Sequence, residues 1–178
     1  MKVLLTSLLL SMCYTGISQG LTQIHETDHY KIRFPEKWTL IEDDDLGEAI
    51  HIVAPKSGFE DEFTENVSVV IQDLSGVQIG IDDFVKLAEK QIEETVQEGQ
   101  VLSSKRFEAG RIKSHKLIYK GVIQGFRLKL IRYYQLNNNK AYILTYTALE
   151  KDFEQHKLYG QQILNSFRFK SWVPKSYR

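Results

Sequence analysis

The chain has 178 residues, of which 42% are hydrophobic, 26% are charged and only three are proline. This composition is that of a globular protein able to bury a core, and it excludes a fibrous or a disordered chain. The 23 acidic and 23 basic side chains give a formal net charge of zero. That balance argues against a nucleic-acid binder, because such proteins neutralise phosphates with an excess of Lys and Arg.

The charges are unevenly distributed along the chain. Residues 19–99 carry 19 acidic and 6 basic side chains, whereas residues 100–178 carry 4 acidic and 16 basic ones. We favour the interpretation that strands and helices from both halves interleave in one sheet, so that their charges largely compensate. The alternative is a bipolar surface that orients a charged partner as it approaches.

The first 18 residues have the pattern of a bacterial secretory signal peptide. Lys2 supplies a positive start, residues 3–10 form an apolar run, and residues 16–18 are a small-x-small cleavage pattern. We therefore expect an exported protein, periplasmic or extracellular, that begins at Gln19 after cleavage. The apolar run is shorter than the roughly 20 residues that cross a bilayer, so no transmembrane segment is expected after processing.

Residues 10–13 offer a rival interpretation of the same segment. Leu10-Ser11-Met12-Cys13 resembles a lipoprotein box, which would attach a lipid anchor at Cys13 and tether the protein to a membrane. We disfavour it because Met12 stands where a small residue is usual. Cys13 is the one cysteine of the chain, so a mature chain without it has no disulfide, thiolate metal site or cysteine nucleophile.

Three short strands are predicted at the start of the mature chain. In residues 29–34, apolar side chains alternate with charged ones, which is the period of a half-buried strand, and Pro35 ends it. Residues 38–42 and 49–54 are predicted as two further strands, and the acidic turn at 43–45 between them suggests a hairpin.

A central strand and a helix follow. Residues 67–74 are rich in β-branched side chains, which favours a strand inside a sheet. Between residues 81 and 96 the apolar residues recur at intervals of three and four, the spacing of an amphipathic helix. Asp82 and Asp83 favour the positive N-terminal end of that helix, whose apolar face is expected to cover the sheet.

The second half predicts an antiparallel sheet closed by a last helix. Four successive strands are expected at residues 101–107, 111–122, 125–136 and 140–147. Residues 137–139 are all asparagine, which tolerates the left-handed conformations of a tight turn. Thr147 and Glu150 suggest a capping box for a helix at residues 150–165, where Gly160 would allow close approach to the sheet.

Several of these segments together resemble the PsbP-like superfamily, which includes bacterial DcrB-type proteins. In the first half the resemblance is carried by Tyr30-Lys31-Ile32-Arg33-Phe34-Pro35 followed by Trp38, and by Glu65-Asn66-Val67-Ser68-Val69-Val70 leading into a helix. In the second half it is carried by Gly110-Arg111 with His115-Lys116-Leu117 and Tyr119, by residues 141–148, and by Ile163-Leu164-Asn165-Ser166-Phe167-Arg168-Phe169. The likeness covers about residues 27 to 169.

The resemblance implies an α+β fold, an α/β/α sandwich with a central, mostly antiparallel sheet flanked by helices. It implies a PsbP-like domain at residues 19–170, with residues 171–178 as a short C-terminal extension. Members of the superfamily act mainly by binding rather than by catalysis. The matching positions are core residues, so no site is transferred from the family.

Candidate chemistry is sparse in this sequence. It contains no G-x-S-x-G elbow, glycine-rich phosphate loop or H-E-x-x-H motif, and we expect neither an enzyme nor a cofactor. His25 and His29 are weak candidates for metal ligands, since they lie four residues apart beside acidic residues. Their segment is predicted as a loop entering a strand, where that spacing has no special geometry, so no metal site is predicted.

The best predicted binding surface is a basic stripe formed by Arg127, Lys129, Lys116 and Lys120. Strand alternation sends Arg127 and Lys129 to the face opposite their apolar neighbours Leu128 and Leu130. We nevertheless favour the interpretation that these charges only solubilise the sheet or guard its edge, so the stripe is a weak candidate.

We therefore expect a non-catalytic extracytoplasmic accessory protein that acts through contacts with an envelope or extracellular protein. The alternative is a carrier of a small or lipid-like ligand, which would need a site for that ligand between sheet and helix. An enzyme is the third possibility.

Overall fold

The structure is a computed structural model that describes residues 20–43, 49–58, 62–109 and 112–170. The predicted signal peptide, Cys13 and the predicted extension at 171–178 lie outside the described residues.

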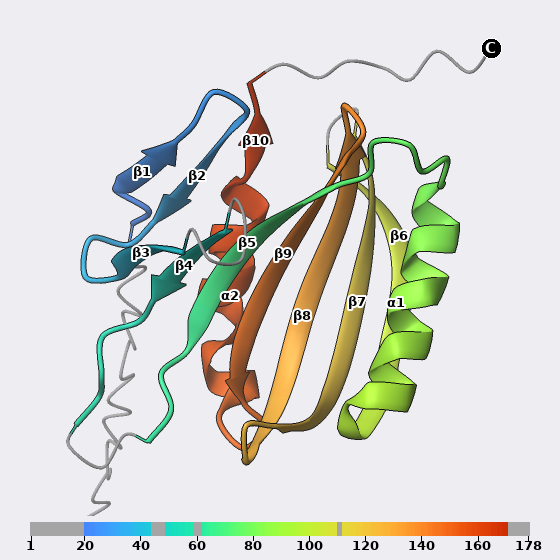
Figure 1. The fold of residues 1–178 in the computed structure, drawn as a ribbon. Coiled ribbons are helices and arrows are strands. Elements are labelled where there is room, and N and C mark those ends of the chain that lie inside the picture. The colour runs from blue at the N-terminus through green and yellow to red at the C-terminus, as the bar shows by residue number, and fades with distance from the viewer. Residues whose placement is uncertain (1–19, 44–48, 59–61, 110–111, 171–178) are drawn as a thin grey trace, which may run out of the picture.

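The described chain forms ten strands and two helices (Figure 1). In chain order they are β1 (Gln23–Glu26), β2 (Tyr30–Phe34), β3 (Thr39–Asp43), β4 (Ala49–Val53), β5 (Asn66–Asp73), α1 (Ile81–Thr95), β6 (Gln97–Ala109), β7 (Ile112–Ile123), β8 (Phe126–Asn137), β9 (Lys140–Leu149), α2 (Phe153–Ser166) and β10 (Arg168–Phe169).

The strands form a large and a small sheet. The large sheet has seven strands in the order β3-β4-β5-β9-β8-β7-β6, and every neighbouring pair is antiparallel. The small sheet has the order β1-β2-β10 and lies at the upper left of Figure 1. Its last strand pairs Arg168 with Lys31 and Phe169 with Tyr30, which joins the two ends of the described chain.

Each helix covers a different face of the large sheet and buries its own hydrophobic cluster. On one face α2 packs over β9 and β5 and also contacts β2; the fully buried residues of this cluster include Ile52, Val67, Leu144 and Ile163. On the other face α1 packs against β6, β7 and β8, with Val85 and Ile92 buried over Leu117 and Tyr119. The predicted α/β/α arrangement with a central antiparallel sheet is therefore confirmed.

Local chemistry explains several element boundaries. β2 ends at Phe34, immediately before Pro35, because proline lacks the N–H that a sheet ladder uses. Asn138 and Asn139 have φ of 50° and 55°, the left-handed values expected of the tight turn between β8 and β9. At Gly160 a Cβ atom would lie 2.2 Å from the Tyr146 ring, so the predicted close approach of α2 to the sheet is confirmed.

The structure also differs from the prediction at three places. The polar residues 19–28 contain a strand, β1, which pairs with β2 in the small sheet. α2 begins at Phe153 with Asp152 as its N-cap and no side-chain capping bond, and Thr147 lies inside β9, so the predicted capping box is wrong. Thr147 pairs with both β5 and β8, and the strand continues past it because Ala148 and Leu149 pair with β8, which outweighs a local capping motif.

Ion pairs join the acidic and basic halves of the chain. Glu26 pairs with Lys170 at 2.8 Å, Glu98 pairs with Arg127 at 2.6 Å, and Asp82 pairs with Arg106. These contacts agree with the expected compensation of charge between the halves. The expected interleaving of strands is wrong for the large sheet, where β3-β4-β5 and β9-β8-β7-β6 form two adjoining blocks.

Candidate functional site

The four residues of the basic stripe lie on one face of the large sheet, as strand alternation predicts. Lys120 is paired across the ladder with Lys129, and Lys116 with Tyr133, on the face that α2 partly covers. Leu128 and Leu130 belong to the cluster on the opposite face. The structure thus brings the predicted residues together.

Most of the positive charge of the basic stripe is already neutralised within the chain. Arg127 makes a two-pronged contact with Glu98, at 2.6 and 3.1 Å. The amine of Lys120 lies 2.8 Å from Glu150, and that of Lys129 lies 2.9 Å from Glu154. A cation held by a neighbouring carboxylate has less free charge to offer a partner, so the stripe is a weaker contact surface than its sequence suggests.

Lys116 is the member of the stripe without an ion pair among the described residues. Its amine lies 5.9 Å from the centroid of the Tyr133 ring, within reach of a cation–π interaction. Burial lowers the pKa of Lys116, and the nearby positive charge of Lys157 lowers it further. This lysine therefore packs along the sheet more than it projects into solvent.

His25 and His29 line one pocket of about 310 Å³ together with Asp28 and Glu42. The Nδ1 atom of His25 is 3.9 Å from a carboxylate oxygen of Glu42, while His29 is exposed. Across the part of the chain that the structure describes, no group of three or more His, Cys, Asp or Glu side chains is arranged to hold a metal ion.

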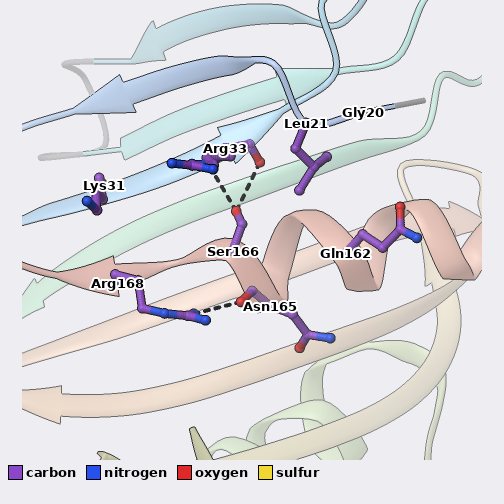
Figure 2. Close-up of a pocket in the computed structure, with 8 residues that line it drawn as sticks. All are labelled: Gly20, Leu21, Lys31, Arg33, Gln162, Asn165, Ser166 and Arg168. Atoms are coloured by element: carbon purple, nitrogen blue, oxygen red, sulfur yellow. Dashed lines mark hydrogen bonds between the residues drawn. The ribbon is translucent and has the colours of Figure 1, made fainter. Parts of the chain in front are cut away.

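A second concentration of positive charge lies where β2, β10 and the end of α2 meet (Figure 2). Its pocket has a volume of about 670 Å³ and is lined by Gly20, Leu21, Lys31, Arg33, Gln162, Asn165, Ser166 and Arg168. We call it the basic pocket, after the cations Lys31, Arg33 and Arg168. Lys31 and Arg33 point outward because Tyr30, Ile32 and Phe34 of the same strand point into the core.

The side chain of Ser166, at the end of α2, forms hydrogen bonds with β2 in the basic pocket. Its Oγ accepts a hydrogen bond from the backbone N–H of Arg33 at 2.8 Å. The same hydroxyl lies 3.0 Å from the carbonyl oxygen of Arg33 and 2.7 Å from that of Ile163, and it donates its one hydrogen to one of them. Figure 2 shows Ser166 between the strand and the helix. The backbone of β2 at Arg33 is therefore tied to the end of α2, while the side chains of Lys31 and Arg33 are exposed.

Within the described part of the chain, the cations of the basic pocket have no carboxylate partners like those of the stripe. Arg168 donates to the carbonyl oxygens of Asn165 and Phe167, at 2.7 and 2.6 Å, where the negative end of the helix dipole favours a cation. Among the described residues, no carboxylate forms an ion pair with Lys31 or Arg33.

Glu26 is the cross-strand neighbour of Lys31, but it is already engaged elsewhere. Its carboxylate pairs with Lys170 at 2.8 Å, and this hydrogen bond is the main cause that lowers the pKa of Glu26. The charge of Lys31 contributes less. The outer face of the small sheet therefore carries more positive than negative charge.

Sequence reasoning did not single out the basic pocket. The outward direction of Lys31 and Arg33 follows from the alternation in β2, and that signal was present in the sequence. The position of Arg168 beside Lys31 depends on the pairing of the two-residue strand β10 with β2, for which no local sequence pattern exists.

No helix within the described ranges is long and apolar enough to cross a membrane. A search of curated protein sequences finds no significant match.

Solved structures with the same fold come from several bacteria. The cyanobacterial PsbP, CyanoP, from Synechocystis sp. PCC 6803 has a TM-score of 0.62 and 12% identity, covering 83% of this chain and 91% of its own. LpqN of Mycobacterium tuberculosis, described as involved in cell envelope biogenesis, has a TM-score of 0.61 and 11% identity over 80% of this chain and 83% of its own. PA94 of Pseudomonas aeruginosa, a protein of unknown function, has a TM-score of 0.59 and 15% identity over 89% of this chain and 100% of its own.

The family model named PsbP matches residues 20–169, which is most of the chain and nearly all of its described part. The likeness to CyanoP, LpqN and PA94 covers at least 80% of this chain in each case. The resemblance seen in the sequence is confirmed, and the chain belongs to the PsbP family.

Proposed function

We propose that this protein is a non-catalytic accessory protein that acts outside the cytoplasm and binds an envelope or extracellular protein through its basic pocket. Membership of the PsbP family supports a non-enzymatic accessory role in broad terms. The signal-like start of the sequence supports export, and the fold is shared with LpqN, which is described as involved in cell envelope biogenesis.

The observation that carries the proposal is the difference between paired and unpaired cations. Three of the four stripe residues are held by Glu98, Glu150 and Glu154. Lys31 and Arg33 carry charges that no described carboxylate neutralises, on a strand that Ser166 fixes to α2. Uncompensated cations on a strand that is tied to the core favour an acidic partner surface and raise the rate of encounter with it.

The test is capture of crosslinked partners from native cells, with mass spectrometry of bound proteins and extracted small molecules. The pocket variant is Lys31→Glu with Arg33→Glu, and the matched control is Arg127→Glu with Lys129→Glu on the stripe. We expect a reproducible protein partner that the pocket variant loses and the stripe variant keeps. If only the stripe variant loses the partner, the contact lies on the stripe and not in the basic pocket. If both variants keep the partner, the contact does not depend on these charges.

A further inference from the structure

Among the residues that the structure describes, no helix lies over one half of the large sheet on the α1 side. α1 packs against β6, β7 and β8 on this face, and α2 lies on the opposite face. In Figure 1 the faces of β5 and β9 turned toward the viewer are not crossed by a helix, while α1 lies at the right. We call this surface the open face, formed by the outward residues of β4, β5 and β9 with the adjoining part of β8.

A row of polar side chains crosses the open face in strand register. Ladder partners lie on the same face of a sheet, and the row is given by the pairs His51 with Ser68, Ser68 with Thr145, and Thr145 with Arg132. The next row is apolar and joins Val70, Ile143 and Tyr134. The polar row is thus continuous over four strands and ends at a permanent cation, Arg132.

The surroundings of Arg132 hold it in place but do not neutralise it. Its Nε donates to the Thr145 hydroxyl at 3.1 Å, and its guanidinium carbon lies 5.1 Å from the centroid of the Tyr119 ring. Thr145 and Tyr119 are only 5% and 2% exposed, so the guanidinium contacts side chains that are themselves buried. No carboxylate of the described residues forms an ion pair with Arg132.

A cation in this setting is costly. Arg132 is half-buried, and a charge that is partly removed from water is stabilised mainly by a counter-charge or by several hydrogen bonds. The Tyr134 hydroxyl is buried beside Arg132 and shares a hydrogen bond with it. Burial raises the pKa of Tyr134, and the positive charge of Arg132 opposes that rise. A guanidinium has five N–H donors, so Arg132 keeps donors beyond those that reach Thr145 and Tyr134 among the described residues.

The side chains of the polar row and of the apolar row beside it indicate which kind of ligand would bind the open face. A planar guanidinium binds a carboxylate through two parallel hydrogen bonds, and Arg132 is the one permanent cation of the row. A single cation matches a singly charged anion better than a doubly charged phosphate. Val70 and Ile143 beside it are half-buried and apolar, so they match a hydrocarbon body.

We propose that the open face binds a small monocarboxylate ligand, with its carboxylate at Arg132 and Thr145 and its apolar body against Val70 and Ile143. This site is separate from the basic pocket and does not depend on a protein partner.

The test is a titration of the full processed chain with octanoate, followed by two-dimensional amide NMR. The matched probes are octan-1-ol, which lacks the charge, and octylammonium, which reverses it. We expect octanoate to shift amides of β8 and β9 around Arg132 and Thr145, and the uncharged and cationic probes to bind about tenfold more weakly or worse.

Two variants distinguish a site at Arg132 from general adsorption. Arg132→Met should weaken octanoate binding by about tenfold or more, because a charge-assisted contact is lost. Lys116→Met is the control, since Lys116 is also a half-buried cation over a tyrosine ring but lies on the opposite face. It should leave octanoate binding unchanged.

The proposal is overturned if excess octanoate causes no shifts, if octan-1-ol binds as well as octanoate, or if the shifts map to the basic pocket instead. Equal binding by Arg132→Met and the wild type would also overturn it. If Arg132→Met does not fold, Arg132→Lys keeps the charge but not the planar fork, and weaker octanoate binding by that variant supports the site. The positions of the shifted amides in the wild-type protein show whether octanoate binds at Arg132, and this result needs no variant.

Discussion

The two helices cover their faces of the large sheet differently, and the connections of the chain explain why. α2 begins three residues after β9, a central strand, so it lies over the middle of its face. α1 is joined to β6 by Val96 alone, and β6 is an edge strand, so the C-terminal end of α1 must stay at that edge. A short connection to an edge strand is therefore enough to leave part of a sheet face open.

The first prediction compares one buried isoleucine beneath each helix. Ile163 of α2 is 0% exposed in the centre of its cluster, and Ile92 of α1 is 3% exposed nearer to the sheet edge. We expect Ile163→Ala to lower the free energy of unfolding by about 4 kcal/mol and Ile92→Ala by about 2 to 3 kcal/mol, because a cavity near the edge can collapse more easily. Urea unfolding of both variants measures the difference, and a larger loss for Ile92→Ala would contradict the comparison.

The second prediction concerns the close approach of α2. In Gly160→Ala the new methyl would lie 2.2 Å from the Tyr146 ring, so the helix must shift away from β9. We expect a net loss of about 2 kcal/mol, although alanine by itself favours a helix by about 1 kcal/mol over glycine. Thermal unfolding, monitored by circular dichroism, measures this loss of stability. A variant more stable than the wild type would show that α2 is not tightly packed against Tyr146.

A comparable position is Gly121 of β7, which lies against the junction between α1 and β6, and we expect a smaller effect there. A Cβ atom at Gly121 would lie 2.5 Å from Cγ1 of Val96, a side-chain atom that can move, and 3.1 Å from the carbonyl oxygen of Gln97. Gly121→Ala should therefore cost about 1 kcal/mol. The two alanine variants should be measured side by side, since a greater cost at Gly121 would mean that the junction between α1 and β6 is packed more tightly than α2 is against Tyr146.

The smallest effect is expected at the start of α2, where Glu154 contacts Lys129 and Lys157. Hydrogen bonds from Lys157 and then Lys129 lower the pKa of Glu154 to about 2, from a usual value of 4.5. A lowered folded-state pKa adds stability that is fully present above the unfolded-state pKa and is lost as the pH falls toward the folded-state value.

Glu154→Gln should accordingly be slightly less stable than the wild type at neutral pH, and this difference should disappear between about pH 4.5 and pH 2. The effect is small because Glu154 is exposed and water screens its ion pairs. Unfolding by urea at a series of pH values measures it. A difference between the two proteins that does not change with pH would mean that the pairs do not contribute.

Most strands and both helices could be predicted from side-chain periodicity. The alternation of Tyr30, Ile32 and Phe34 predicted β2, and the spacing of apolar residues predicted a helix at 81–96, close to α1 at Ile81–Thr95. β1 could not be predicted, because three of its four residues are exposed and it exists as a strand through pairing with β2. β10 is only two residues long and depends on the same partner.

The candidate sites show the limits of local patterns. Alternation placed the basic stripe on one face, but its neutralisation by Glu98 and Glu154 could not be seen, because those carboxylates come from β6 and α2. Arg132 was visible in the sequence as one basic residue of β8. Its proposed role in binding a carboxylate depends on its pairing with Thr145 and on how far α1 extends over the sheet. Both are properties of the assembled fold.

The pairing of β2 with β10 also sets an order of events in folding. β2 lies near the start of the described chain and β10 at its end, so this ladder closes only when almost the whole polypeptide is present. Contacts between distant segments form late, because a long loop must be closed first. A chain that passes a membrane from its N-terminus would therefore expose the apolar side of β2, including Tyr30 and Ile32, until residue 169 had emerged. During that time this segment is where a chaperone would bind.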